Sequence, residues 1–288
     1  MVDFGELWRQ EARVRRAPDD AAAWDKRAHE FTSKYGPSGY SEEFLRLAGL
    51  QPGETVFDMG CGAGALAIPC AERGHAVLAA DFSPVMLERC TSDAPAGVRP
   101  LIQTKLLSWD ENWDIAGLTV HSYDVAFASR SIATADMQAA IMKLSRIARR
   151  KVCVTLVAGK SPRVSKALFD DLGLRCTGHQ DAAFAFGIAT QLGFQPSVEF
   201  IRSVRADSFE SREQAYQAYE DMIRFSDEAP QGDRLSAYQQ CAREWVDAHL
   251  REGSVELAGV QEVNRGLAYT IDAPRTFAWA FISWDVRL

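Results

Sequence analysis

Three glycines and an acidic residue have the spacing of a nucleotide-binding loop. Gly60, Gly62 and Gly64 stand at alternate positions after a short apolar run that ends on Asp58, within the segment VFDMGCGAGALA at 56–67. A glycine loop between a strand and a helix points backbone N–H groups and the positive end of the helix dipole at one spot. We expect this loop to hold a polar ligand, because glycine has no Cβ to collide with it and readily adopts a positive φ.

The glycine spacing alone leaves two interpretations open. Gly60, Gly62 and Ala65 fit the dinucleotide pattern G-x-G-x-x-G/A, whereas Gly60, Gly62 and Gly64 fit G-x-G-x-G. Asp58 distinguishes the two, because its charge would repel the pyrophosphate of a dinucleotide and attract a ligand that carries an ammonium group.

A second acid narrows the class of ligand. Asp81 lies 21 residues beyond Gly60, at the end of the next predicted strand, where a carboxylate can accept both hydrogen bonds of a ribose diol. A ligand with a ribose and a cationic amino-acid end, but no phosphate, is S-adenosylmethionine (SAM). The residues therefore predict a SAM site, with S-adenosylhomocysteine (SAH) as the product of methyl transfer.

The elements that must position these residues alternate between strand and helix. Ser83 is expected to cap a helix with Pro84 at its first position, and Gly74 to end the helix before it. Strands are predicted over 55–59, 75–81, 99–106, 122–129 and 151–157, and helices over 42–50, 65–74, 83–91 and 135–148. This order specifies an α/β fold with a doubly wound parallel sheet.

The alternation ends after Gly159, and the rest of the chain is mostly helical. The predicted elements outside the sheet core are helices at 3–16, 20–34, 166–173, 182–193, 211–226 and 234–251 and strands at 197–206 and 276–286. The two late strands could join the sheet edge, one of them antiparallel. We therefore predict an N-terminal helical cap at 1–40, a SAM-binding α/β domain at 41–208 and 271–288, and a helical lid insertion at 209–270.

Composition excludes several classes of partner. The 288 residues carry a formal charge of −7, which argues against the broad positive surface of a nucleic-acid-binding protein. No apolar run approaches the roughly 18 residues of a membrane span, so we expect a cytoplasmic protein without a membrane partner. The five histidines show no ligand spacing, so no metal is expected, and the six cysteines are expected to be free thiols.

Two segments around the glycine loop together resemble a known protein family. VFDMGCGAGALA together with VLAADFSPVMLE resembles the nucleotide-binding half of class I SAM-dependent methyltransferases, whose pattern is acid-x-G-x-G-x-G followed by a strand that ends in an acid and by x-S-x-x-M-L. The resemblance covers residues 20–157. It implies a Rossmann-like methyltransferase sheet and SAM as cofactor.

The resemblance also implies roles for individual residues of the cofactor site. Asp58 and the backbone amides of Gly60, Cys61 and Gly62 would hold the methionine end, and Asp81 would bind the ribose hydroxyls. Ser129 would stand at the end of the strand that faces the transferred methyl. The residues implied around the adenine are Phe82, Met86, Leu107, Ser108 and Trp109, with Asp110 as a partner for the exocyclic amine.

Contacts to the methyl acceptor are expected from three parts of the chain. Arg130 follows Ser129, the N-terminal helix would close over SAM, and the predicted lid carries aromatic stripes that suit a small, partly apolar acceptor. The predicted acceptor contacts are Trp24, Arg27, Arg130, Tyr219 and Trp245. The N-P-P motif of enzymes that methylate nucleic-acid amino groups is absent, so we expect a small-molecule acceptor, and the chain could form a homo-oligomer.

Methyl transfer from a sulfonium depends mainly on holding nucleophile, methyl and sulfur in line. The sequence has no triad and no His–carboxylate spacing that would indicate a general base, so no catalytic residue is predicted. Two alternatives to a methyltransferase remain. One is a SAM-binding sensor or pseudoenzyme without turnover, and the other is an NAD(P)-dependent oxidoreductase, which Asp58 and the FSPVML segment disfavour.

Overall fold

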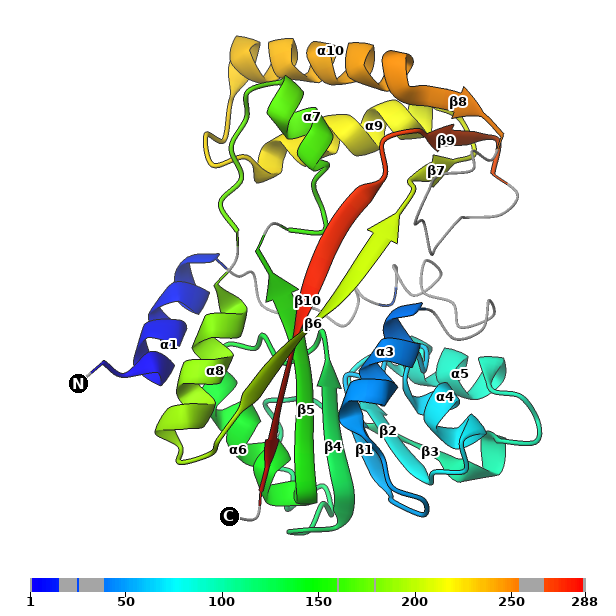
Figure 1. Ribbon diagram of the computed structural model, residues 1–288, viewed down its shortest axis with the longest axis vertical. Coiled ribbons are helices and arrows are strands. Elements are labelled where there is room, and N and C mark those ends of the chain that lie inside the picture. Colours follow the sequence, from blue (N-terminus) through cyan, green and yellow to red (C-terminus); the bar gives the residue numbers. More distant parts are fainter. Residues whose placement is uncertain are drawn as a thin grey trace. The chain divides into compact units, whose positions relative to one another are not determined.

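The computed structural model describes residues 2–15, 25, 39–159, 161–178, 180–253 and 267–286. The chain forms two compact units (Figure 1). Unit 1 comprises Met1–Leu156, Asp181–Ile201 and Trp279–Leu288, and unit 2 comprises Val157–Gln180 and Arg202–Ala278. Unit 2 is therefore wider than the insertion predicted at 209–270, because it also takes in segments on either side. Most of the helix predicted at 20–34 lies outside the described residues.

A seven-stranded sheet organises unit 1. Its order is β3-β2-β1-β4-β5-β10-β6, and β3, β2, β1, β4 and β5 run parallel. The last strand of the chain, β10, runs in the opposite direction between β5 and β6 (Figure 1). The strands are β1 Val56–Met59, β2 Val77–Asp81, β3 Ile102–Leu106, β4 Tyr123–Ser129, β5 Ala148–Ala158, β6 Ser197–Arg205 and β10 Arg275–Asp285. The predicted mostly parallel sheet with a late antiparallel strand is confirmed.

Strands β1 and β2 are short and completely buried, which explains their sequence. Because all their residues are buried, these strands are, apart from Asp58 and Asp81, continuous apolar runs rather than alternating ones. Of the strand predicted over 99–106, the first three residues instead form a 3-10 turn, η2 Arg99–Leu101, and β3 begins at Ile102. Pro100 lies within this turn and has no backbone N–H to give to a strand.

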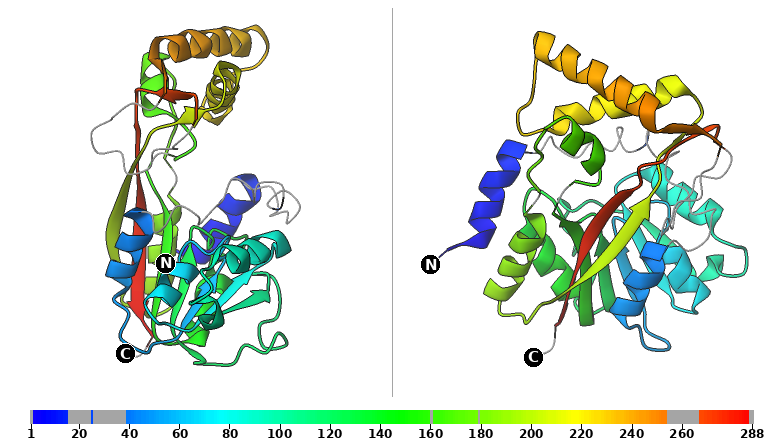
Figure 2. Two further views of the ribbon diagram at one scale, coloured as in Figure 1. Left: turned by 90° about the vertical axis from the view of Figure 1, so that its right-hand side faces the viewer. Right: turned by 45° about the horizontal axis from the view of Figure 1, so that its top comes forward.

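Helices surround the sheet of unit 1, and α1, α6 and α8 pack against one another (Figure 2). The hydroxyl of Ser83 accepts a hydrogen bond from the amide of Met86 at 3.1 Å, so the predicted N-cap of α5 is present. The helix predicted at 65–74 is shorter than expected. The helices are α1 Phe4–Arg15, α3 Gly39–Ala48, α4 Ala67–Glu72, α5 Pro84–Asp93, α6 Met137–Ile147 and α8 Asp181–Gln191.

Unit 2 combines helices with a small antiparallel sheet of order β7-β9-β8. The hydrophobic pattern of the sequence predicts both long helices but not these three short strands. One apolar cluster joins the helices through residues such as Phe169, Tyr219 and Trp245. The elements are α7 Lys166–Asp171, β7 Ser208–Phe209, α9 Arg212–Met222, η3 Ile223–Phe225, α10 Gly232–His249, β8 Leu250–Glu252 and β9 Tyr269–Ile271. None of the helices in the described part of the chain is long and apolar enough to cross a membrane.

Candidate active site

The carboxyl ends of β1, β2 and β4 bring the predicted site residues together. In the parallel register Asp58 stands opposite Ala79 of β2 on one side and Phe127 of β4 on the other. Asp81 and Ser129, which end β2 and β4, therefore lie two residues further along their strands than the partners of Asp58. Open α/β sheets bind ligands at this edge.

Asp58 is a buried acid without a partner. Its side chain is 1% exposed, and neither Oδ1 nor Oδ2 has a hydrogen-bond partner among the described residues. Burial and then the charge of Asp81 raise the pKa of Asp58 to about 7, while the charge of Arg130 lowers it. An unpaired buried carboxylate is costly to the fold, so a cationic ligand group would find a site here that the protein already maintains.

The three positions of the loop require glycine for different reasons. All have positive φ values, of +74° at Gly60, +53° at Gly62 and +89° at Gly64. A Cβ at position 60 would lie 2.3 Å from Cβ of Ser131, and one at position 64 would lie 2.8 Å from Sγ of Cys90. A Cβ at position 62 would meet no atom of the described residues within 4 Å. Within the described structure, Gly62 is therefore the glycine of this loop that borders open space, and the other two accommodate the protein's own side chains rather than a ligand.

The loop amides are already used by the chain. The amides of Gly60 and Cys61 donate to the carbonyl of Ala80 at 2.7 and 3.1 Å, and the amide of Gly62 donates to Oδ2 of Asp81 at 2.9 Å. These amides fix the loop against β2, in contrast to the predicted direct contacts with the methionine end. The Cys61 thiol is buried, and a hydrogen bond with Cys90 and burial raise its pKa well above the usual value, so it is not a reactive thiolate.

Asp81 holds the start of α5 as well as the loop. Its Oδ1 accepts from the amide of Ser83 at 2.9 Å, and the Ser83 hydroxyl donates to Asp25. Burial raises the pKa of Asp81, and hydrogen bonds from the backbone of Ser83, Gly62 and Phe82 lower it. Each carboxylate oxygen can accept a second hydrogen bond, so Asp81 keeps the capacity to bind a ribose diol.

The residues predicted around the adenine line this edge in part. Phe82 is half-buried, whereas Met86 and Leu107 are buried, with Met86 packed on Ala63. The backbone of Ser108 accepts from Nε1 of Trp113 at 3.0 Å. Trp109 packs on Trp113 with ring centroids 5.4 Å apart. Asp110 is exposed, and its amide donates to the Ser108 hydroxyl at 3.2 Å.

A polar network at the ends of β4 and β5 was not predicted. The Tyr40 hydroxyl from α3 makes hydrogen bonds with Oγ of Ser129 at 2.7 Å and with Oγ1 of Thr155 at 2.6 Å. Arg130 lies over the Tyr40 ring at 4.5 Å and over the Trp279 ring at 5.5 Å. Tyr40 and Trp279 come from segments far from the motifs, and no pattern in the sequence marks them.

The other predicted acceptor contacts are Trp24, Arg27, Tyr219 and Trp245. Trp24 and Arg27 lie outside the described residues. Tyr219 and Trp245 stack with ring centroids 5.2 Å apart in the core of unit 2, where the Trp245 Nε1 donates to Asp171 at 2.8 Å. Tyr219 is completely buried and Trp245 is 7% exposed. Their side chains hold α9 and α10 together, in contrast to the predicted contacts with an acceptor.

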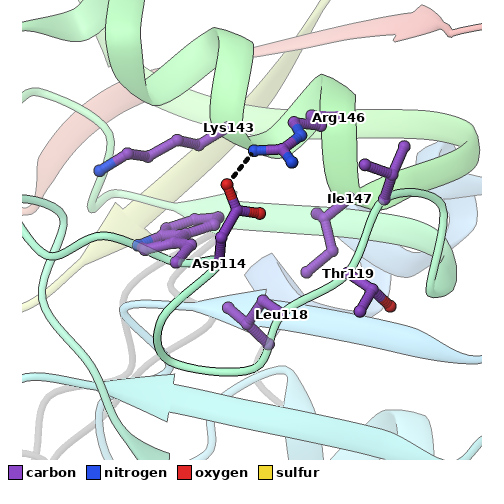
Figure 3. Close-up of a pocket in the computed structure, with 8 residues that line it drawn as sticks. Asp114, Leu118, Thr119, Lys143, Arg146 and Ile147 are labelled. Atoms are coloured by element: carbon purple, nitrogen blue, oxygen red, sulfur yellow. Dashed lines mark hydrogen bonds and ion pairs between the residues drawn. The ribbon is translucent and has the colours of Figure 1, made fainter.

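A small pocket in unit 1 involves none of the predicted contacts. It lies between the loop that follows β3 and helix α6, where Arg146 pairs with Asp114 at 2.7 Å (Figure 3). The Lys143 ammonium donates to the carbonyl of Glu111 at 2.9 Å, so both cations are used by the chain. Among the described residues, no group of three or more His, Cys, Asp or Glu side chains could hold a metal ion.

Comparison with known proteins agrees with this geometry. Residues 56–151, which contain Asp58, the glycine loop, Asp81 and Arg130, match the family model described as a methyltransferase domain. This part of the chain is a methyltransferase domain. The match begins at the first residue of β1 and ends within β5. It therefore covers the strands whose ends form the site.

One curated relative and one solved structure extend the comparison beyond residues 56–151. An uncharacterized protein of Haemophilus influenzae is 29% identical over 202 residues, which are 69% of this chain and 71% of the relative. The crystal structure of a candidate methyltransferase from Bacillus halodurans C-125 is similar with a TM-score of 0.51 and 11% identity, covering 86% of this chain and 99% of that one. At this identity the second likeness concerns the fold alone. The predicted Rossmann-like fold of the class I methyltransferases is confirmed.

Proposed function

We propose that the protein transfers the methyl group of SAM to a small-molecule acceptor. The observation that carries this proposal is the buried carboxylate of Asp58, which has no hydrogen-bond partner among the described residues and stands in β1, two residues before the glycine loop. A dinucleotide would bring a pyrophosphate to this loop, and the buried carboxylate of Asp58 would repel it. The ammonium and ribose of SAM match Asp58 and Asp81.

The residues present fit this cofactor. Asp58 would hold the ammonium, Asp81 would accept hydrogen bonds from the ribose hydroxyls, and Phe82 and Met86 would contact the adenine. Gly62 leaves room for the ligand to approach the backbone. When bound, SAM supplies a methyl group on a positively charged sulfur that leaves as a neutral thioether.

The chain's own contribution to the reaction is positioning. The amides of Gly60, Cys61 and Gly62 tie the loop to β2, and the Tyr40 hydroxyl ties the ends of β4 and β5 together. These bonds hold the donor side and the ends of the neighbouring strands in fixed places. Alignment of the reacting groups in a site that excludes water supplies much of the rate in such displacements.

Ligand binding and turnover test the proposal separately. Calorimetry should show saturable binding of SAH and no binding of NADH, because only SAH carries an ammonium for Asp58. Asp58→Asn should weaken SAH binding by about 1.5 to 3 kcal/mol, the worth of a hydrogen bond to a charged group. Incubation with SAM and a metabolite extract should then yield SAH and a new methylated mass. Binding of NADH in preference to SAH would refute the proposal, and SAH binding without any product would indicate a sensor rather than an enzyme.

A further inference from the structure

Arg130 stands at the same edge as the cofactor residues, with its backbone fixed. It follows Ser129, the last residue of β4, and Ser129 pairs with Thr155 of β5. The Arg130 amide donates to both the carbonyl and the hydroxyl of Thr155 at 3.1 Å. On the other side of β4, the hydroxyl of Ser131 donates to the carbonyl of Met59 at 2.6 Å. Arg130 is therefore held between β5 and the glycine loop of β1.

Two aromatic rings support the guanidinium. Its Cζ atom lies 4.5 Å from the centroid of Tyr40 and 5.5 Å from that of Trp279. Tyr40 is 4% exposed, and its hydroxyl makes hydrogen bonds with Ser129 and Thr155. A guanidinium packed on aromatic rings still has N–H donors in its own plane for a ligand.

The charge of Arg130 has no acidic partner in the described part of the chain. Arginines at the opposite end of the sheet differ in this respect, because Arg149 pairs with Asp124 at 3.2 Å and Arg146 pairs with Asp114 at 2.7 Å. The acid that Arg130 affects is Asp58, whose pKa is raised by burial and lowered by the Arg130 charge. The site thus presents an unpaired carboxylate and an unpaired guanidinium near each other.

The backbone of Arg130 is also unusual. Its φ is +60°, in the left-handed region that residues with a Cβ seldom adopt. Such conformations cost free energy and persist where the surrounding structure enforces them, often at functional sites. Here the hydrogen bonds to Thr155 and the contact with Tyr40 enforce it, and the result is a cation held at the edge where the ligand would lie.

We propose that Arg130 is the residue of this site that binds a carboxylate. The inference rests on the proposed function and names a ligand group that this function leaves open. The planar fork of an arginine matches the two oxygens of a carboxylate, and one guanidinium balances one such charge. The carboxylate can belong to the amino-acid end of SAM, next to the ammonium held by Asp58, or to the acceptor.

The variants that test this proposal are Arg130→Asn and Arg130→Lys, with Arg149→Gln as the matched control. Asparagine tolerates a left-handed φ better than most residues, so the first variant should fold. Lysine keeps the charge and loses the planar fork. Arg149 is an arginine of β5 at the other end of the sheet, and its replacement should change no ligand affinity. Thermal unfolding verifies that all four proteins are folded.

The first arm measures the affinity of SAH and of SAH without its carboxylate by calorimetry. If Arg130 binds the carboxylate of the amino-acid end, Arg130→Asn weakens SAH about 10- to 100-fold, the loss expected for a charged hydrogen-bonded pair. The decarboxylated compound then binds the wild type and Arg130→Asn equally. Arg130→Lys should fall between the wild type and Arg130→Asn.

The second arm uses the protein saturated with SAH and titrates acetate, glycine, succinate and benzoate, each against its primary amide. If Arg130 binds an acceptor carboxylate, the wild type prefers at least one acid over its amide, and Arg130→Asn loses that preference while SAH binds both proteins equally. Phenyl phosphate is titrated in the same way as an anion without a carboxylate. The proposal is wrong if Arg130→Asn changes neither arm, or if phenyl phosphate is the only anion affected. Absence of SAH binding to the wild type would instead refute the proposed function, and this inference with it.

Discussion

A Cβ at Gly60 would lie 2.3 Å from Cβ of Ser131, whereas a Cβ at Gly62 would meet no described residue within 4 Å. Two glycines in one loop therefore serve different purposes, although both have a positive φ. Gly60 lets the loop after β1 pack against the segment after β4, and the Ser131 hydroxyl donates to the carbonyl of Met59 in the same contact. Gly62 leaves the loop accessible from outside.

This difference predicts that one alanine variant mainly loses stability and that the other mainly loses affinity for SAH. Gly60→Ala should destabilise the fold by more than the roughly 1 to 2 kcal/mol of left-handed strain, because the methyl group also clashes with Ser131. Gly62→Ala should cost only that strain and should weaken SAH binding strongly. Chemical denaturation and calorimetry measure the two effects.

Gly53 provides a matched control for Gly62. It also has a positive φ, of +82°, and open space around its Cβ position, but it lies in the turn before β1. Gly53→Ala should lose as much stability as Gly62→Ala and should bind SAH normally. Equal SAH affinity in both variants would show that the open side of Gly62 does not face the ligand.

The buried carboxyl of Asp58 predicts that stability falls as pH rises. Burial raises its pKa to about 7, above the value in the unfolded chain, so between roughly pH 4 and 7 the folded state binds the extra proton. The protonated Asp58 carboxyl therefore makes its full contribution to the free energy of unfolding below about pH 4. This contribution is lost progressively up to about pH 7, and above pH 7 the free energy of unfolding no longer depends on this group. The full contribution amounts to about 4 kcal/mol. Urea denaturation of the wild type and Asp58→Asn from pH 5 to 8 measures the part of this contribution that is lost above pH 5, as the change in their difference.

Asp58→Asn should accordingly be more stable than the wild type at pH 8, although it binds SAH less well. A difference between the two proteins that stays constant from pH 5 to 8 would contradict the raised pKa. Asp81 has a pKa raised by burial as well, so Asp81→Asn in the same series separates the two acids.

Ligand binding should release a proton from Asp58 near pH 6.5. The ammonium of SAH is already charged at this pH, and its arrival favours the ionised form of the carboxyl. Binding enthalpies measured in phosphate and in imidazole buffer should therefore differ by up to the difference between the ionisation enthalpies of the two buffers, because up to about one proton is released. In Asp58→Asn the two buffers should give the same enthalpy, apart from any contribution of Asp81. Buffer-independent enthalpies in the wild type would mean that the ammonium does not reach Asp58.

The cofactor motif is local in sequence, and its spacing therefore predicts some residues of the site but not others. The glycine loop, Asp58 and Asp81 lie within one strand-loop-helix-strand unit, so their spacing alone brought them together at one edge of the sheet. Tyr40, Thr155 and Trp279 reach that edge from α3, β5 and β10, and only the strand order of the sheet makes them neighbours.

Apolar residues at helical spacing predict a buried helix face but not what covers it, because the pattern is the same whether the face packs on a ligand or on another helix. Tyr219 and Trp245 belong to such faces, and they stack on each other inside unit 2. A role of 209–270 as a lid over the acceptor stays a prediction. Deletion at those limits would leave Leu168 and Phe169 of the same cluster without their partners, so point variants are better tests than the deletion.

Asp81 should matter for both ligand binding and loop order. Asp81→Ala removes the acceptor of the amides of Gly62 and Ser83 together with the proposed ribose contact. We expect SAH to bind less tightly by about 1.5 to 3 kcal/mol, since charged hydrogen bonds are lost. Calorimetry tests this, and Ser83→Ala is the control because it removes the N-cap of α5 and leaves the carboxylate. Equal losses in the two variants would assign the effect to helix capping alone.

Asp207 should be the most sensitive position in unit 2. Its carboxylate accepts from Nη2 of Arg275 at 2.6 Å and from the hydroxyl of Tyr219 at 3.1 Å, and Arg205 lies 3.3 Å away. The Arg275 side chain is 7% exposed. Asp207→Asn leaves this buried cation without a countercharge, which should cost about 3 to 5 kcal/mol. Hydrogen exchange of the amides in α9 and α10 should then become much faster.

The control for this prediction is Asp247→Asn, which breaks an exposed pair with Arg212 in the same unit. Surface pairs contribute up to about 1 kcal/mol, so exchange in the core amides should change little. Asp207 has no place in the proposed cofactor contacts, and its replacement should leave the intrinsic SAH affinity of the folded protein unchanged. If the Arg275–Asp207 pair holds unit 2 together, an unpaired charge on the buried Arg275 must cost more than one on the exposed Arg212. Comparable effects of Asp207→Asn and Asp247→Asn on hydrogen exchange would therefore show that the buried ion pair does not hold unit 2 together.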